Sequence, residues 1–163
     1  MPDALELLKT RKSISASFLG PPVPSEAELA EIFAIASRVP DHGKLTPWRF
    51  IVFEDDGRVK ASRALAALFK AQHPEATEKQ LDEERRRLAQ APLVVAVVSK
   101  AAPHPKIPEW EQVLSAGNAA MNLVLAAGET RFVSEARGLR PEPGSRFAGN
   151  QVQENTVSLI GRA

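Results

Sequence analysis

Cysteine is absent from the 163-residue sequence. This absence excludes disulfide bonds, thiolate nucleophiles and metal sites with sulfur ligands. It also fits a reducing compartment, because disulfides form and persist where the surroundings are oxidising. Any catalysis or ligand binding must therefore depend on other side chains.

Long apolar runs are also lacking. No run approaches the roughly 20 residues that a membrane-spanning helix needs. The first residues, MPDALELLK, carry acids where a secretory signal peptide would carry cations. We therefore expect a soluble cytoplasmic protein with no membrane partner.

An excess of charge of one sign is missing as well. Lys and Arg number 21 against 20 Asp and Glu, which leaves a net charge of +1. A nucleic-acid binder needs cations in excess on one face, so we expect no nucleic-acid partner. The length and the ordinary share of hydrophobic residues predict one globular domain over residues 1–163.

The common signatures of catalytic and nucleotide sites do not occur. The sequence has no GxGxxG, P-loop, HExxH or GxSxG, which would mark dinucleotides, triphosphates, zinc or acyl transfer. Its three histidines, His42, His73 and His104, stand at no spacing typical of metal ligands. We predict no metal site, and no acid, base or nucleophile can be singled out.

Helical patterns are nevertheless clear. Asp3 can cap a first helix, and Ser25 with Glu28 forms a capping box that predicts a second helix, which Pro40 would end. Three more helices are expected at residues 58–71, 77–89 and 109–127.

Strand patterns are fewer. Residues 48–54 are rich in aromatic and β-branched side chains, and the apolar run 92–100 is typical of a central strand buried on both faces. After Gly128 the periodicity is lost, and only VSLIG at 157–161 indicates a strand. Such a sheet is small for so many helices. Either another subunit completes it, or this region folds differently.

Cations gather at helix ends and in loops. They are Arg11 and Lys12 with Ser13, Arg38 with His42 and Lys44, and His104 with Lys106. A guanidinium, an ammonium and a hydroxyl together have the chemistry to hold a phosphate. The alternative for the first group is that it only stabilises the negative C-terminal end of its helix.

Three motifs follow one another along the chain: Arg11-Lys12-Ser13, residues 37–50 and residues 104–117. Together they resemble motifs of the FMN-dependent nitroreductase family. Arg11-Lys12-Ser13 is similar to that family's Arg-Arg-Ser motif. Residues 37–50, SRVPDHGKLTPWRF, resemble the R-x-P-D-H-x-x-x-x-P-W-x-F stretch of its short branch of NAD(P)H nitroreductases. Residues 104–117, HPKIPEWEQVLSAG, are similar to that branch's H-x-K-x-P-x-W-E-Q-x-x-S-A-G. The resemblance covers most of residues 1–127.

The resemblance implies an α+β fold with a central mixed sheet flanked by helices. It further implies an intertwined homodimer with one FMN in each of two interface pockets. Arg11, Lys12 and Ser13 of one subunit would bind the ribityl chain and phosphate, although Lys12 stands where the family more often has Arg. Arg38 and His42 of the other subunit would reach the same flavin. Trp48 is expected to anchor its strand rather than touch substrate.

The implied activity needs no catalytic side chain. NADH or NADPH would deliver hydride to the flavin, and a nitroaromatic, quinone or similar acceptor would then be reduced by two electrons in a ping-pong reaction. The alternative is a degenerate member that binds flavin or dimerises without turnover. Arg38 and His42 also keep local alternatives, since they can stabilise a helix end and cap a turn.

The region 128–163 is atypical for the family. Members of the branch continue through a Gly-Phe-Gly turn to a Trp-Arg-Ser segment that lies on the flavin, and ETRFVSEARGLRPEPGSRFAGN contains no such segment. The chain is also shorter than the resemblance predicts. Part of the flavin wall, the substrate pocket and the dimer contact would depend on this region.

Overall fold

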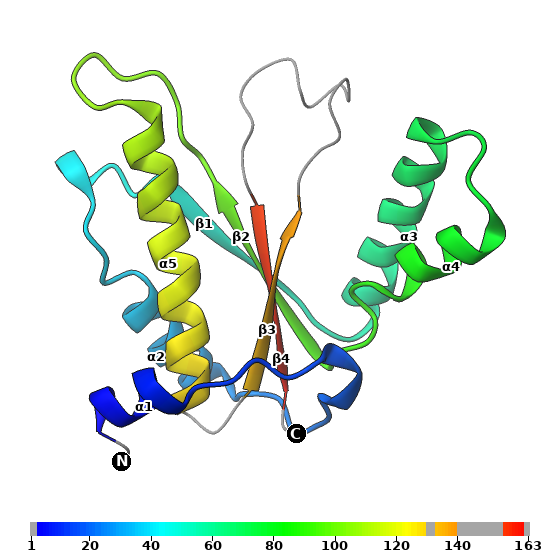
Figure 1. The fold of residues 1–163 in the computed structure, drawn as a ribbon, viewed down its shortest axis with the longest axis horizontal. Helices are drawn as coiled ribbons and strands as arrows, with labels where there is room; N and C mark the ends of the chain where they lie inside the picture. The colour runs from blue at the N-terminus through cyan, green and yellow to red at the C-terminus, as the bar shows by residue number, and fades with distance from the viewer. Residues whose placement is uncertain (1–2, 130–132, 140–154, 162–163) are drawn as a thin grey trace.

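The computed structural model describes residues 3–129, 133–139 and 155–161. Figure 1 shows an α+β arrangement in which a central sheet lies between two groups of helices. The α-helices are α1 (Ala4–Thr10), α2 (Glu26–Ala36), α3 (Asp55–Gln72), α4 (Glu78–Arg86) and α5 (Glu109–Glu129). The strands are β1 (Trp48–Phe53), β2 (Leu93–Ser99), β3 (Val133–Leu139) and β4 (Asn155–Gly161). Two short 3-10 helices, η1 (Ala16–Phe18) and η2 (His42–Lys44), lie in the connections.

The sheet has the order β1-β2-β4-β3, and every neighbouring pair is antiparallel. The expected mixed sheet is therefore not what the described strands form. The reason lies in the connection between β1 and β2. Helices α3 and α4 carry the chain away and back, so Phe53 pairs with Val94 and β2 runs in the opposite direction to β1. The expected strand at 157–161 is confirmed within β4, whereas the sequence pattern does not predict β3.

Strand β2 is buried on both faces, as predicted. Leu93, Val95 and Val97 pack in a cluster with α2 and α5 on one side of the sheet. The alternate residues Val94 and Ala96 belong to a second cluster on the other side. Because successive side chains of a strand point to opposite faces, this one strand joins both cores.

Trp48, at the start of β1, is 8% exposed and belongs to the cluster with α2 and α5. The expectation that it anchors its strand is confirmed. Trp110, by contrast, lies on the surface of α5 and is 62% exposed.

Local capping explains where the first helices begin. Asp3 accepts a hydrogen bond from the Leu5 amide, and Ser25 and Glu28 form the reciprocal capping box. Pro40 does not end α2, which stops at Ala36. The amide of Arg38 bonds the carbonyl of Ile35 in a tight final turn, so the helix has ended before the proline is reached.

Helices α3 and α4 form a hairpin beside the sheet. The buried Ser62 hydroxyl accepts a hydrogen bond from the Leu88 amide at 3.1 Å. On the outer surface of α4, hydrogen bonds from Arg85 to Asp82 and then to Glu78 raise the pKa of its guanidinium. No helix in the described part of the chain is both long and apolar enough to cross a bilayer.

Candidate functional site

The first predicted group, Arg11 to Ser13, lies at the exposed end of α1. The Arg11 amide caps the helix by donating to the Leu7 carbonyl at 2.8 Å, and its guanidinium lies 3.4 Å from the Ser13 hydroxyl. Lys12 stands between them and is exposed. Within the described residues, no carboxylate forms an ion pair with Arg11 or Lys12. These donors can therefore receive an anionic group.

The second predicted group lies on the loop between α2 and β1. Asp41 fixes this loop by accepting the Thr46 amide at 2.7 Å. Three of its residues have left-handed backbones: Gly43 at φ 72°, Lys44 at 54° and Thr46 at 45°. A Cβ at Gly43 would lie 2.5 Å from Cδ1 of Ile107. Glycine suits position 43 for two reasons: it adopts the left-handed backbone without steric cost, and it has no Cβ to collide with Ile107.

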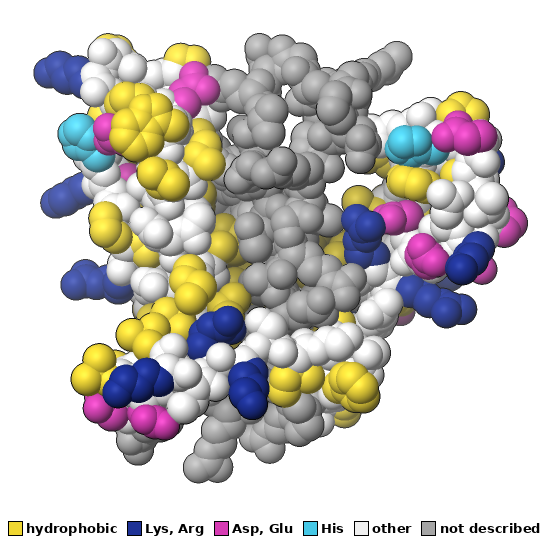
Figure 2. Space-filling model, in the orientation of Figure 1, with side chains coloured by type: hydrophobic (Ala, Val, Ile, Leu, Met, Phe, Trp, Pro, Cys, Tyr) yellow, Lys and Arg dark blue, Asp and Glu magenta, His cyan; other side chains and the backbone are white. Residues whose placement is uncertain are grey.

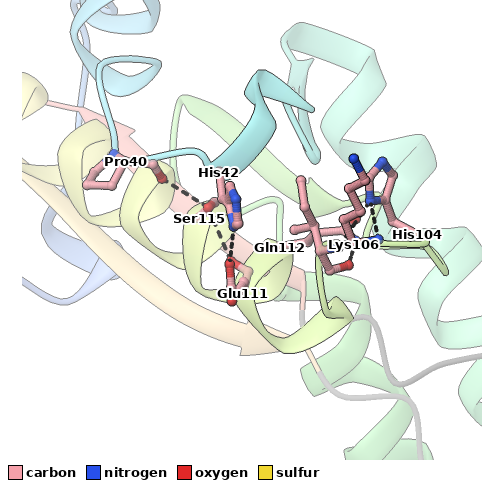
Figure 3. A network of polar contacts seen from close by, with 8 residues as sticks. Pro40, His42, His104, Lys106, Glu111, Gln112 and Ser115 are labelled. Atoms are coloured by element: carbon pink, nitrogen blue, oxygen red, sulfur yellow. Dashed lines mark hydrogen bonds and ion pairs between the residues drawn. The ribbon is translucent and has the colours of Figure 1, made fainter.

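Helix α5 holds this loop along its length, in contacts that the sequence did not predict. Glu111 Oε2 lies 2.8 Å from Nδ1 of His42, and the Ser115 hydroxyl donates to the Pro40 carbonyl at 2.9 Å (Figure 3). Further along, the Asn122 amide donates to the Arg38 carbonyl at 3.2 Å. Glu111, Ser115 and Asn122 recur at helical spacing, which is the one sequence signal that could have indicated a polar stripe.

The third cationic group has a structural role in its loop. Nδ1 of His104 accepts the backbone amides of Lys106 at 3.2 Å and of Ile107 at 3.1 Å. The Gln112 side chain donates to the carbonyls of Ala102 and Ile107 nearby. Together these bonds close the turn that precedes α5 (Figure 3).

Arg11 and His42 lie near opposite ends of α5, whereas the backbone of Arg38 lies between them, beside Asn122. His42 contacts Glu111 in the first turn of this helix, whereas Leu7 of α1 lies beside Gly128 near its end. The stretch from Glu111 to Gly128 is roughly 25 Å long at about 1.5 Å per residue. Arg11 and His42 of one chain therefore cannot contact the same small group.

An exposed apolar stripe runs beside the polar one on α5. Trp110, Leu114 and Met121 are all exposed, and Gly117 lies between them with no atom near the position of an added Cβ. Figure 2 shows hydrophobic side chains over this side of the molecule. A helix with such a stripe can pack closely against another surface.

The sequence was compared with protein-family profiles and with curated proteins. A sequence profile described as "Nitroreductase family" matches residues 8–134. The chain belongs to the nitroreductase family. Among curated relatives, the Escherichia coli protein named "Putative NAD(P)H nitroreductase YdjA" is 40% identical over 161 residues, covering 97% of this chain and 86% of the relative.

Solved structures of nitroreductases share the fold. A nitroreductase-like family protein from Bacillus cereus superposes with a TM-score of 0.74 at 17% identity, covering 99% of this chain and 86% of the other. A nitroreductase with bound FMN from Desulfitobacterium hafniense superposes with a TM-score of 0.66 at 20% identity, covering 100% of this chain and 90% of the other.

For this nitroreductase-family chain, the structure thus keeps Arg11, Lys12 and Ser13 together and places Arg38 and His42 on one loop. Arg11 and His42, which lie near opposite ends of α5, do not meet within one chain. The region 128–163, in which the sequence shows no Trp-Arg-Ser segment, is described only at residues 128–129, 133–139 and 155–161, so its relation to a flavin lies outside the described residues. No cluster of three or more potential metal ligands occurs in the described part of the chain.

Proposed function

We propose that this protein is an FMN-dependent oxidoreductase that uses NADH or NADPH to reduce nitroaromatic, quinone or similar acceptors by two electrons. Membership of the nitroreductase family supports the class of reaction. The observation that carries the assignment of the cofactor is the exposed donor set of Arg11, Lys12 and Ser13, which has no acidic partner among the described residues. The FMN bound in the D. hafniense protein agrees with this cofactor, and the name of the E. coli relative agrees with NAD(P)H as the reductant.

The donor set fits the phosphate end of FMN. Arg11 offers a planar fork of N–H donors, Lys12 adds a charge, and the Ser13 hydroxyl lies within reach of the same guanidinium. When bound, FMN supplies the redox chemistry, taking hydride from the nicotinamide and passing two electrons to the acceptor. The side chains of this protein bind and orient it, and no side chain is assigned a proton-transfer step.

Arg38 and His42 complete the site from a second copy of the chain in this proposal. The separation of roughly 25 Å along α5 applies to Arg11 and His42, and it favours a second copy as the source of His42 at the same flavin. The apolar stripe of Trp110, Leu114, Gly117 and Met121 supplies a surface for the homodimer interface. Charged residues are depleted and aromatic residues enriched at the centre of such interfaces, which suits this stripe.

The order in which the two substrates react follows from their use of one binding site. Nicotinamide and acceptor would use the same open face in turn, which predicts ping-pong kinetics. The chemical identity of the acceptor and the choice between NADH and NADPH remain part of the proposal, as does the cytoplasmic location.

The first experiment is the visible absorption spectrum of the purified protein, with the released cofactor identified after denaturation. We expect a stoichiometric FMN spectrum that bleaches anaerobically with NADH or NADPH and recovers on addition of a nitroaromatic or a quinone. A colourless protein that does not take up added FMN would refute the proposal. Bound FMN that no nicotinamide reduces would reject the enzymatic part and retain a flavin-binding module.

The assignment of Arg11 is tested by Arg11→Ala. Loss of its charge-assisted bonds should weaken FMN binding by about 1.5–3 kcal/mol, roughly 10- to 150-fold. Lys9→Ala is the matched control, because it removes an exposed cation from the last turn of the same helix. FMN titration of the apo-protein measures both variants. Equal affinity of Arg11→Ala and parent protein would reject this phosphate contact.

A further inference from the structure

We propose that Glu111 is a positioning residue that fixes the tautomer and the orientation of His42. The inference rests on the proposed function, in which His42 contacts the flavin. Glu111 Oε2 lies 2.8 Å from Nδ1 of His42, across a gap of 69 residues in the sequence. An ionised carboxylate only accepts hydrogen bonds, so the hydrogen of the neutral imidazole must lie on Nδ1.

This tautomer determines what the other ring nitrogen can do. With the hydrogen on Nδ1, Nε2 of neutral His42 is a hydrogen-bond acceptor, and it points away from Glu111 because the two nitrogens lie on different sides of the ring. Nε2 then suits a hydroxyl or N–H group of the bound cofactor. It becomes a donor only when the ring is protonated.

The surroundings of His42 indicate that the contact with Glu111 mainly orients the imidazole ring. Its backbone is already fixed by the left-handed Gly43 and by the bond from Ser115 to the Pro40 carbonyl. Its ring, however, is exposed, and the hydrogen bond to Glu111 is the only one that its side chain makes among the described residues. Exposed ion pairs contribute little to folding free energy, so the contact with Glu111 chiefly selects one ring position.

His104 supplies an internal contrast. Its Nδ1 accepts two backbone amides, from Lys106 and Ile107. The hydrogen of neutral His104 must therefore lie on Nε2. The structure assigns opposite tautomers to His42 and His104 of the same chain.

Nuclear magnetic resonance of the cofactor-free protein tests the assignment directly. Long-range proton–nitrogen correlations of ¹⁵N-labelled protein, recorded at about pH 9 to about pH 10, well above the ordinary histidine pKa so that neutral histidine is observed, distinguish the two tautomers. We expect hydrogen on Nδ1 of His42 and on Nε2 of His104, with signals assigned by His42→Asn and His104→Asn. Glu111→Ala should abolish the Nδ1–H preference of His42 alone. Glu111→Gln should weaken this preference, because a glutamine amide can either accept from Nδ1–H or donate to a bare Nδ1.

Glu109→Ala is the matched control, since it removes a carboxylate from the same first turn of α5. Hydrogen on Nε2 of His42 in the parent protein would overturn the inference. So would a His42 tautomer that does not respond to Glu111→Ala, or that responds equally to Glu109→Ala.

FMN titration then tests whether the position matters to the cofactor. Glu111→Ala should weaken FMN binding roughly 3- to 30-fold in the parent protein, and should have no further effect in His42→Ala. Effects of the two substitutions that simply add would overturn the link between Glu111 and the cofactor. A parent protein that binds no FMN refutes the proposed function instead, and the tautomer measurement still decides the role of Glu111.

Discussion

Replacement of Gly43 by alanine should destabilise the loop that carries His42. The left-handed backbone at φ 72° costs a residue with a Cβ about 1–2 kcal/mol. The new Cβ would also lie 2.5 Å from Cδ1 of Ile107, whose side chain is buried and must shift, at about 1–3 kcal/mol. We expect a total loss of about 3 kcal/mol in unfolding free energy, which corresponds to roughly 6–12 °C in Tm for a chain of this size.

Urea unfolding followed by tryptophan fluorescence measures this loss at one fixed protein concentration. Gly57→Ala is the matched control, because no atom lies within 4 Å of its added Cβ inside α3. That substitution should instead stabilise the protein by about 0.5–1 kcal/mol.

A double-mutant cycle isolates the steric part of the effect. Ile107→Val removes the Cδ1 atom that the new Cβ would meet, and by itself should cost about 0.5–1.5 kcal/mol. In the Gly43→Ala protein it should cost clearly less, because it relieves the clash. Equal stability of Gly43→Ala and parent protein, or an unchanged cost of Ile107→Val in both backgrounds, would refute the reasoning.

Two further substitutions test the elements around the site. Ser62→Ala should lower the unfolding free energy by about 1–3 kcal/mol, because the fully buried hydroxyl accepts the Leu88 amide and its loss leaves that donor unpaired. An unchanged urea midpoint would contradict this bond. Ser25→Ala should cost about 1 kcal/mol through loss of the α2 capping box, whereas Ser17→Ala, at an exposed residue, should change thermal unfolding little. Equal effects of these two serine substitutions would argue against the cap.

Features with local causes could be predicted from the sequence. The caps at Asp3 and Ser25 involve backbone groups only a few residues away, so their pattern is visible in a short window. The apolar run of β2 likewise indicates burial on both faces without reference to its neighbours. In each case the physical cause and the sequence signal cover the same few residues.

Strand β3 could not be predicted in this way. Its sequence, VSEARGL, contains Glu, Arg and Gly, which are poor or neutral strand formers. It is a strand because β4 pairs with it along its whole length, from Val133 opposite Gly161 to Leu139 opposite Asn155. Tertiary pairing thus outweighs a weak local preference.

The candidate site also combines features that are visible in the local sequence with contacts that only the fold brings about. The motifs nominate Arg11 and His42 because their residue types and order are visible in the sequence. The partnership of His42 with Glu111 spans 69 residues, and nothing in either segment specifies the other. Only the fold shows that the polar residues of α5 face the loop.

Helix α5 connects the parts of the proposed site because its three faces have different tasks. One face is buried and contributes Ala116, Ala119 and Leu123 to the core. The next face binds the loop through Glu111, Ser115 and Asn122. The third is the exposed apolar stripe that the proposed dimer would cover. Because one rigid helix carries both the loop contacts and the interface, docking of two copies through this stripe would set where each His42 lies relative to the Arg11 of its partner. The cofactor site would then depend on the geometry of the interface, and disruption of the stripe should weaken FMN binding because it would remove the second copy's Arg38 and His42 from the site.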